Sequence, residues 1–245
     1  MSTSGDFLQW SEPKEILTPD AQDPADLQWY NNTGFVCGSQ YHGLIEAYYP
    51  ATTDTIDIQL ISSRDGTNWE RCFDRSPFIA NGEFDREWDW GCIYVAGSPP
   101  VRVGDELYFY YSGFGMRHET PYKLTVPKRN NPSCRGIGLA TLRLDGFVSL
   151  HSGSAGGRVL TAPVRIEGDS LQINAQCRGE LRVEILDEHQ RPISGFALEE
   201  CQALTRDSVS STVKWKGGSL SSLRGKSVHL HFQLQDVDLY SYWSI

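Results

Sequence analysis

The sequence predicts an all-β protein, a partial β-propeller followed by an antiparallel β-sandwich. Helical periodicity is hard to find, whereas β-branched and aromatic residues form short runs that Gly, Pro, Asn and Asp interrupt. An Asp at the head of a short aromatic turn also recurs three times, at Asp6, Asp65 and Asp145. A recurring unit of roughly fifty residues built from short strands is typical of a propeller blade.

The fullest copy of this turn covers residues 63–69, Ser-Arg-Asp-Gly-Thr-Asn-Trp, and follows a strand-like run at 56–61. Asp-Gly favours a turn because Gly accepts positive φ and the Asp side chain caps nearby N–H groups. We expect each turn to join the third and fourth strands of a blade. Asp65 and Trp69 should therefore stabilise the fold and touch no substrate.

Residues 1–152 are expected to form the partial propeller, beginning with the end of one blade at 7–17. Strands of the first complete blade are predicted near 28–36, 44–49, 56–62 and 69–73. Those of the second are predicted near 91–96, 106–111, 136–142 and 147–150. An insertion at 114–134 separates the second and third strands of that blade and explains its greater length.

A second domain, the sandwich, is expected over residues 158–245, after a Gly/Ser-rich linker at 153–157. Its strands are predicted at 171–175, 181–186, 212–215 and 228–234. Apolar and polar residues alternate strictly in the last of these. Such alternation predicts one buried face and one wet face, as in packed antiparallel sheets.

Composition excludes several classes of function. The net charge of −9 over 245 residues argues against a nucleic-acid partner. No apolar run is long enough to span a bilayer, and the N-terminus lacks a signal-peptide pattern, so no membrane association is predicted and the compartment stays open. The six cysteines form no Cys-x-x-Cys pair, so a zinc site is unsupported, while disulfides and free thiols both remain open.

Three stretches carry a resemblance to a known family: 63–69, 104–113 (Gly-Asp-Glu-Leu-Tyr-Phe-Tyr-Tyr-Ser-Gly) and 136–147 (Gly-Ile-Gly-Leu-Ala-Thr-Leu-Arg-Leu-Asp-Gly-Phe). On the basis of these stretches, nearly the whole chain resembles the five-bladed β-propeller glycoside hydrolases of the family 32 and family 43 type, with their C-terminal β-sandwich. The resemblance implies hydrolysis of glycosidic bonds by carboxylates at the centre of the ring. Two whole blades and a strand of a third precede Gly153, and the usual nucleophile motif of the first blade has no counterpart here. We therefore expect the chain to lack the first blades of such a protein.

Propeller geometry narrows the search for a site. The loops that lead into the innermost strands, and those between second and third strands, open on the same face over the central funnel. This face should collect the side chains of Asp23, Asp26, Asp54, Asp85, Glu87, Asp89, His118 and Glu119, with Trp29, Tyr30, Trp88 and Trp90 beside them.

Residues 85–91, Asp-Arg-Glu-Trp-Asp-Trp-Gly, are the best candidate for catalysis, because glycoside hydrolysis uses two carboxyl groups. An extended conformation would turn Asp85, Glu87 and Asp89 to one side and the two Trp residues to the other. We expect Asp89 to lie nearest the funnel axis, with Asp85 or Glu87 assisting. Asp26 is the equivalent of Asp89 in the preceding blade.

Sugar binding is assigned to Trp29, Trp88 and Trp90, whose aromatic faces suit sugar rings, and to His118 as a partner for a substrate hydroxyl. The competing structural interpretation is that the acidic residues cap turns or stay solvated and that His118 is a surface-loop residue. Calcium at Asp20, Asp23 and Asp26 is a weak alternative, since their spacing matches no EF-hand loop.

The sequence thus predicts a glycoside hydrolase-like protein that acts on an oligo- or polysaccharide without a metal or a redox cofactor. One rival is a non-catalytic carbohydrate-binding or scaffolding protein, and another is an inactive fragment of a longer glycosidase. An incomplete propeller exposes unpaired strand edges, so self-association through these open edges is also predicted.

Overall fold

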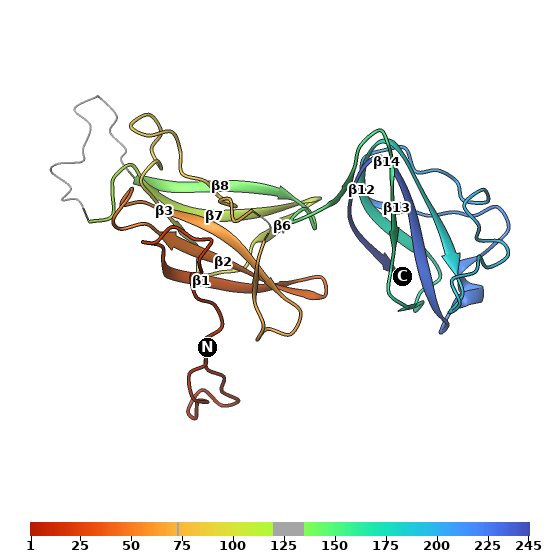
Figure 1. The fold of residues 1–245 in the computed structure, drawn as a ribbon, viewed down its shortest axis with the longest axis horizontal. Helices are drawn as coiled ribbons and strands as arrows, with labels where there is room; N and C mark the ends of the chain where they lie inside the picture. The colour runs from red at the N-terminus through yellow and green to blue at the C-terminus, as the bar shows by residue number, and fades with distance from the viewer. Residues whose placement is uncertain (73, 120–134) are drawn as a thin grey trace. The chain divides into compact units, whose positions relative to one another are not determined.

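A computed structural model describes residues 1–72, 74–119 and 135–245 (Figure 1). The protein is all-β, as predicted, and one 3₁₀ turn is the only helical segment in the described residues. The chain divides by its internal contacts into two compact units, Met1–Thr141 and Leu142–Ile245.

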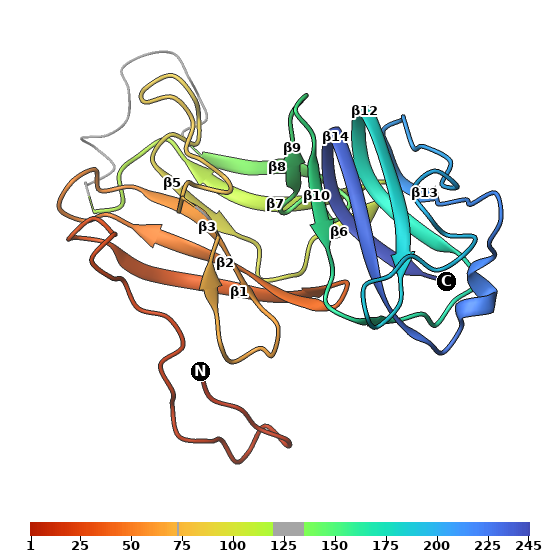
Figure 2. The same ribbon diagram turned by 45° about the vertical axis from the view of Figure 1, so that its right-hand side comes forward.

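The first unit is built on one curled sheet of eight strands (Figure 2). Its strand order is β1-β2-β3-β5-β7-β6, with β4 beside β3 and β8 beside β7. The strands are β1 (Gln28–Cys37), β2 (Gln40–Tyr48), β3 (Ile56–Ser63), β4 (Glu70–Arg71), β5 (Cys92–Val95), β6 (Val101–Val103), β7 (Glu106–Phe114) and β8 (Arg135–Arg143).

Strands β1 to β4 form an antiparallel meander that follows the four strands predicted for the first complete blade. Apart from the exposed Tyr41, the apolar residues of β2 and β3 are buried, which explains the clear signal of these strands in the sequence. A single parallel pair, Ile56 with Cys92, joins this meander to β5 and so makes one continuous sheet.

The second predicted blade agrees with the structure only in part. β5, β7 and β8 lie where its first three strands were expected, and β6 is an additional strand that the sequence analysis missed. The prediction of a fourth strand at 147–150 is wrong, because β9 (Leu150–Ser152) pairs with β14 (Ser227–Ser244) in the second unit. The predicted insertion at 114–134 falls largely outside the described residues, since 120–134 are not among them.

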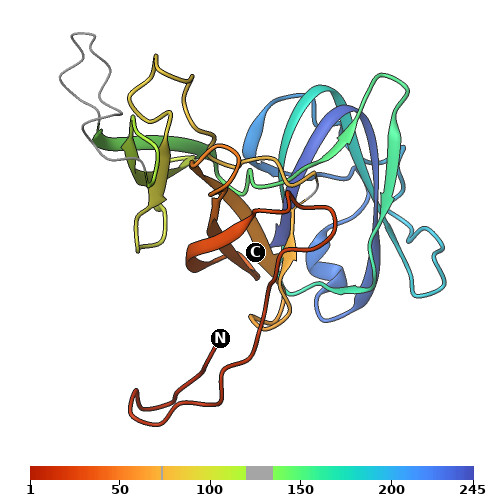
Figure 3. The same cartoon turned by 60° about the vertical axis from the view of Figure 1, so that its left-hand side comes forward.

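Residues 1–14 form an N-terminal arm that leaves the sheet (Figure 3). Its two halves are joined by hydrogen bonds from the Ser11 N–H to the Thr3 carbonyl (2.8 Å) and from the Lys14 N–H to the Met1 carbonyl (2.9 Å). The arm contains no strand, so the blade end expected at 7–17 is not formed as predicted. The side chain of Phe7 is 81% exposed, which shows how little of the arm is packed.

The second unit is a six-stranded sheet in the order β10-β14-β12-β13, with β9 and β11 also paired to β14. Two long strands, β12 and β14, form its centre and pair along almost their full length. Its elements are β9, β10 (Gly157–Leu160), β11 (Val164–Arg165), β12 (Leu171–Leu186), β13 (Ser208–Thr212), the 3₁₀ turn η1 (Leu220–Leu223) and β14 (Ser227–Ser244).

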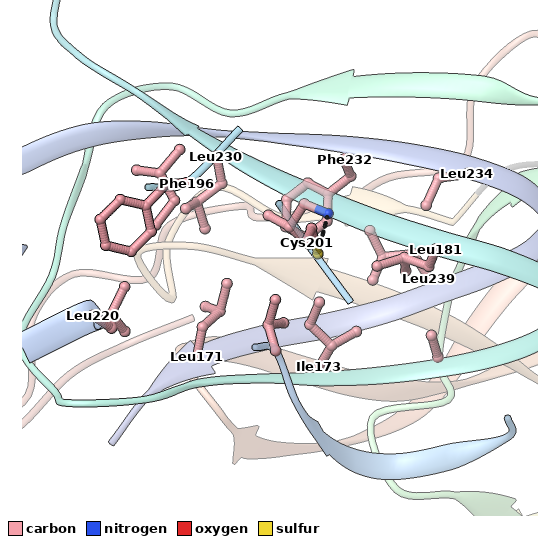
Figure 4. Close-up of a cluster of buried hydrophobic side chains, with 14 of the residues drawn as sticks. Leu171, Ile173, Leu181, Phe196, Cys201, Leu220, Leu230, Phe232, Leu234 and Leu239 are labelled. Atoms are coloured by element: carbon pink, nitrogen blue, oxygen red, sulfur yellow. Dashed lines mark hydrogen bonds between the residues drawn. The ribbon is translucent and has the colours of Figure 1, made fainter. Parts of the chain in front are cut away.

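A single apolar cluster forms the core of the second unit (Figure 4). The alternation predicted at 228–234 is confirmed on the core side, where Val228, Leu230, Phe232 and Leu234 are buried. The opposite side of the strand is less exposed to solvent than predicted. His229 is buried there and shares a 2.8 Å hydrogen bond through Nδ1 with the carbonyl oxygen of Thr161.

Residues 153–157, expected as a linker, lie within the second unit. The Gly156 N–H donates to the Gly153 carbonyl (3.0 Å), which closes a turn between β9 and β10. Both of these strands pair with β14. The division between the units by internal contacts falls earlier in the chain, between Thr141 and Leu142.

Candidate functional site

The acidic segment that precedes β5 folds as a series of turns. The backbone N–H groups of Arg86 and Glu87 both donate to the carbonyl of Glu83 at 3.0 Å, as in one turn of a helix. Asp85 adopts a left-handed backbone (φ 55°) and is exposed. The expected extended conformation is therefore wrong, and alternation no longer sets the directions of Asp85, Glu87 and Asp89.

Asp89 is held at the end of these turns. Its side chain is nearly buried, at 8% exposure, and its Oδ2 accepts a 2.8 Å hydrogen bond from the hydroxyl of Tyr111 in β7. Burial, followed by this hydrogen bond, raises the pKa of the Tyr111 phenol to about 12. Tyr111 therefore remains a hydrogen-bond donor at neutral pH.

Glu87 approaches Asp89 beside a glycine. A Cβ placed on Gly82 would lie 2.4 Å from Oδ1 of Asp89 and 2.8 Å from Oε2 of Glu87. The two carboxylate oxygens are therefore no more than about 5 Å apart, close enough to act on one bound molecule. Oε2 of Glu87 also accepts a 2.5 Å hydrogen bond from the Glu83 N–H, which fixes its position.

An aromatic wall flanks these carboxylates. The Trp88 ring stacks on the Tyr111 ring, with centroids 5.9 Å apart and planes inclined by 13°. A Cβ on Gly113 of β7 would lie 2.5 Å from the Trp88 ring and 2.5 Å from Cβ of Asp89, so this approach requires glycine there. Trp88, which is half-buried, thus lies against the sheet next to Asp89.

Trp90 has different surroundings. Its ring is buried and meets the ring of Phe84 edge-on at 4.6 Å. That packing gives Trp90 a role in holding the turns rather than in presenting an open face to a sugar.

Asp26 and Trp29 are placed with other partners. Oδ2 of Asp26 accepts hydrogen bonds from the N–H groups of Ala51 (3.0 Å) and Thr52 (2.8 Å) and from the Thr52 hydroxyl (2.9 Å). Partial burial opposes ionisation of Asp26, but these hydrogen bonds outweigh it and lower its pKa. The guanidinium of Arg71 lies 4.8 Å from the centroid of Trp29 and covers that ring.

His118 lies in an aromatic cluster. Its ring centroid is 4.6 Å from that of Tyr48 and 5.0 Å from that of Tyr30, while its backbone N–H donates to the Asp54 carbonyl at 2.9 Å. The structure thus brings together Asp89, Glu87 and Trp88, and it gives His118 other contacts.

A second polar group, on β3, was not predicted from the sequence. Asp57 and Gln59 are buried at alternate positions of this strand, and burial raises the pKa of Asp57 to about 6. The amide of Gln59 donates to the Tyr49 hydroxyl (3.0 Å) and accepts from Arg71, which also pairs with Asp23. The signal in the sequence was the polar alternation within the apolar run 56–61.

The residues considered for calcium are engaged otherwise. Arg75 donates two 2.7 Å hydrogen bonds to the two carboxylate oxygens of Asp20 and a third, of 2.9 Å, to Asp23. In the described parts of the chain, no three His, Cys, Asp or Glu side chains gather as a metal ion would require.

Comparison with known proteins adds no family to this description. No protein-family model matches the chain. No curated protein matches it either. Within the described ranges, no helix has the length and apolarity needed to cross a membrane.

Proposed function

We propose that this protein is carbohydrate-active and hydrolyses glycosidic bonds with Asp89 and Glu87. One observation carries the proposal. Two carboxylate oxygens approach within about 5 Å beside Gly82, a separation that suits the paired carboxyl groups of glycosidases. The stacked rings of Trp88 and Tyr111 adjoin the pair and supply an apolar surface for a sugar ring.

The geometry suggests separate roles for the two carboxylates. Asp89 is nearly buried and is held in place by the hydrogen bond from Tyr111, which suits a positioned nucleophile or base. Glu87, the other member of the pair, is assigned the role of the acid that protonates the leaving oxygen. The short separation favours the retaining mechanism, in which the second carboxylate attacks the sugar directly. An oligo- or polysaccharide is the proposed substrate.

The proposed ancestry is the five-bladed β-propeller glycoside hydrolase of the family 32 or family 43 type. Two successive groups of neighbouring strands, β1 to β4 and β5, β7 and β8, support the interpretation of the first unit as a partial propeller, with one parallel pair joining the groups into a continuous sheet. The second unit is then the accessory β-sandwich of such enzymes.

The test is product analysis after incubation with a panel of plant and microbial oligo- and polysaccharides. We expect sugar release by the unmodified protein and its loss in Asp89→Asn and in Glu87→Gln. Asp85→Asn is the matched control, because Asp85 is exposed on the same series of turns. Equal loss in all three variants, or no release from any sugar by folded protein, would reject this pair of residues.

A binding function is the second candidate. Asp89 already accepts from Tyr111, and Glu87 already accepts from the Glu83 N–H, so both carboxylates have partners within the chain. This engagement favours a non-catalytic carbohydrate-binding or scaffolding role, or an inactive fragment of a longer glycosidase. Calorimetric binding of an oligosaccharide without product, weakened by Trp88→Ala, would favour the binding role.

Self-association through an open sheet edge is also proposed. Strand β1 is ten residues long and, in the described residues, pairs along its backbone with β2 alone. Val36 on this strand is exposed. An unpaired edge of this length is a template for another strand.

A further inference from the structure

One side of the sheet formed by β6, β7 and β8 exposes large apolar side chains, and we name it the β6–β8 face. These three strands are neighbours, with β7 in the middle (Figure 1). The exposed apolar residues on them are Val101, Val103, Tyr110, Ile137 and Leu139. Ile137 is 80% exposed, far more than an isoleucine inside a packed sheet.

The residues from β6 and β7 lie on the same side. Val101 pairs with Tyr108, and Val103 pairs with Glu106, so these side chains share a face. Tyr110 follows Tyr108 by two residues and points the same way. The intervening Leu107 and Phe109 are buried on the opposite side.

Strand β8 adds its apolar residues to this side as well. Trp88 lies against Gly113 and Gly136, and the Tyr111 ring lies against Gly138, so β7 and β8 run antiparallel. Gly136 and Gly138 therefore face the side of Trp88. Ile137 lies between them in sequence and faces the other side, as does Leu139.

Charges mark the two ends of the β6–β8 face. Glu106 begins β7 and Arg135 begins β8, and both side chains are exposed. Because the two strands are antiparallel, these opposite charges lie at opposite ends of the apolar surface.

We propose that the β6–β8 face binds the same face of a second copy of this chain. A two-fold axis between the sheets, at right angles to the strands, would place Glu106 of each copy near Arg135 of the other. Apolar side chains would then meet at the centre, with charge pairs at the rim, as in self-complementary dimer interfaces. A two-fold axis along the strands would bring like charges together and is disfavoured.

This interface differs from edge pairing through β1, and it does not depend on the proposed catalytic function. Trp88, Tyr111 and Asp89 lie on the other side of the same strands, so the candidate site stays open in the dimer. The dimer would bury a surface that otherwise faces water, which gives the association its driving force.

The test is sedimentation equilibrium of the full chain over a wide concentration range. We expect a dimer whose dissociation constant rises at least about tenfold in Ile137→Lys. Glu106→Arg and Arg135→Glu should each weaken association, and the double reversal should restore it, because it exchanges the charges without removing a pair. Circular dichroism shows whether each variant is folded. Because the Ile137 side chain is 80% exposed, its replacement should leave the packing of the sheet intact.

Two control variants separate this interface from the alternatives. Val36→Lys alters the β1 edge, and Leu8→Lys alters the exposed N-terminal arm. Leu8→Lys should leave all association intact, whereas Val36→Lys should weaken only pairing through the β1 edge and leave the β6–β8 dimer intact. A monomer at every concentration, a dimer lost in either control variant but kept in Ile137→Lys, or a double reversal that fails to restore association would overturn the proposal.

Discussion

The hydroxyl of Tyr111 in β7 donates a 2.8 Å hydrogen bond to Oδ2 of Asp89, which belongs to the turns before β5. This contact joins two segments that are 22 residues apart in sequence. It orients the Asp89 carboxylate so that the other oxygen, Oδ1, lies beside Gly82 and near Glu87. The candidate site therefore depends on a glycine as much as on its carboxylates.

Gly82→Ala is expected to reduce sugar release on the order of 100-fold, because displacements of about 1 Å in a catalytic group have that effect. The new methyl group would meet both carboxylates and force them apart. Gly97→Ala is the control, since a Cβ there meets nothing within 4 Å. The measurement is kcat/KM on the substrate found in the polysaccharide panel. Equal rates in the two variants would contradict the assignment of this pair.

Asp57→Asn is expected to remove a pH dependence of stability. Burial raises the pKa of Asp57 to about 6 from 3.8, so the bound proton favours the folded state. That stabilisation is complete below about pH 4 and is lost as the pH rises through about 6, with a total on the order of 2–3 kcal/mol. Denaturant unfolding at several pH values should therefore show the unmodified protein losing stability relative to Asp57→Asn between these limits. Parallel plots of unfolding free energy against pH for the two proteins would contradict the assignment of this pH dependence to Asp57.

Asp65→Ala is expected to lower the midpoint of thermal unfolding by several degrees at neutral pH. Oδ1 of Asp65 accepts hydrogen bonds from the N–H groups of Asn68 (2.7 Å) and Thr67 (2.8 Å), which hold its pKa well below the usual range. This lowered pKa means that the stabilisation is present above about pH 4 and is lost in acid. The measurement is a thermal melt followed by circular dichroism.

The N-terminal arm offers a matched control for that variant. Asp6 accepts the same two kinds of hydrogen bond, from the Leu8 N–H (2.8 Å) and the Gln9 N–H (2.9 Å). Because the arm is exposed, Asp6→Ala should leave the melting midpoint nearly unchanged. A shift as large as that of Asp65→Ala would show that the arm is packed in solution.

Phe232→Ala is expected to destabilise the second unit by about 3–5 kcal/mol, the usual cost of truncating a buried phenylalanine. The side chain is fully buried at the centre of the cluster in Figure 4. Leu160→Ala, at an exposed position of β10, should lower the free energy of unfolding far less. Urea unfolding measures both, and similar losses would contradict the placement of this core.

Some of the candidate site followed from the sequence alone. Asp89 stood out because it is an acid between two tryptophans, and the structure places it beside Trp88 and Glu87. Tyr111 and Gly82 were missed, since a hydrogen bond between distant segments and a close approach at a glycine leave no local pattern. The extended conformation expected for 85–91 was wrong because a helical turn from Glu83 competes with it.

What the sequence determined by itself was local: the all-β class, the strands of the first meander and the chemistry of the Asp65 turn. Alternation of apolar residues and turn-forming pairs encode these features over a few residues. Only the tertiary structure decided that residues 150–152 pair with β14 and that the β6–β8 face is left exposed. Strand pairing depends on competition among segments far apart in the chain, and a local pattern does not record which of them wins.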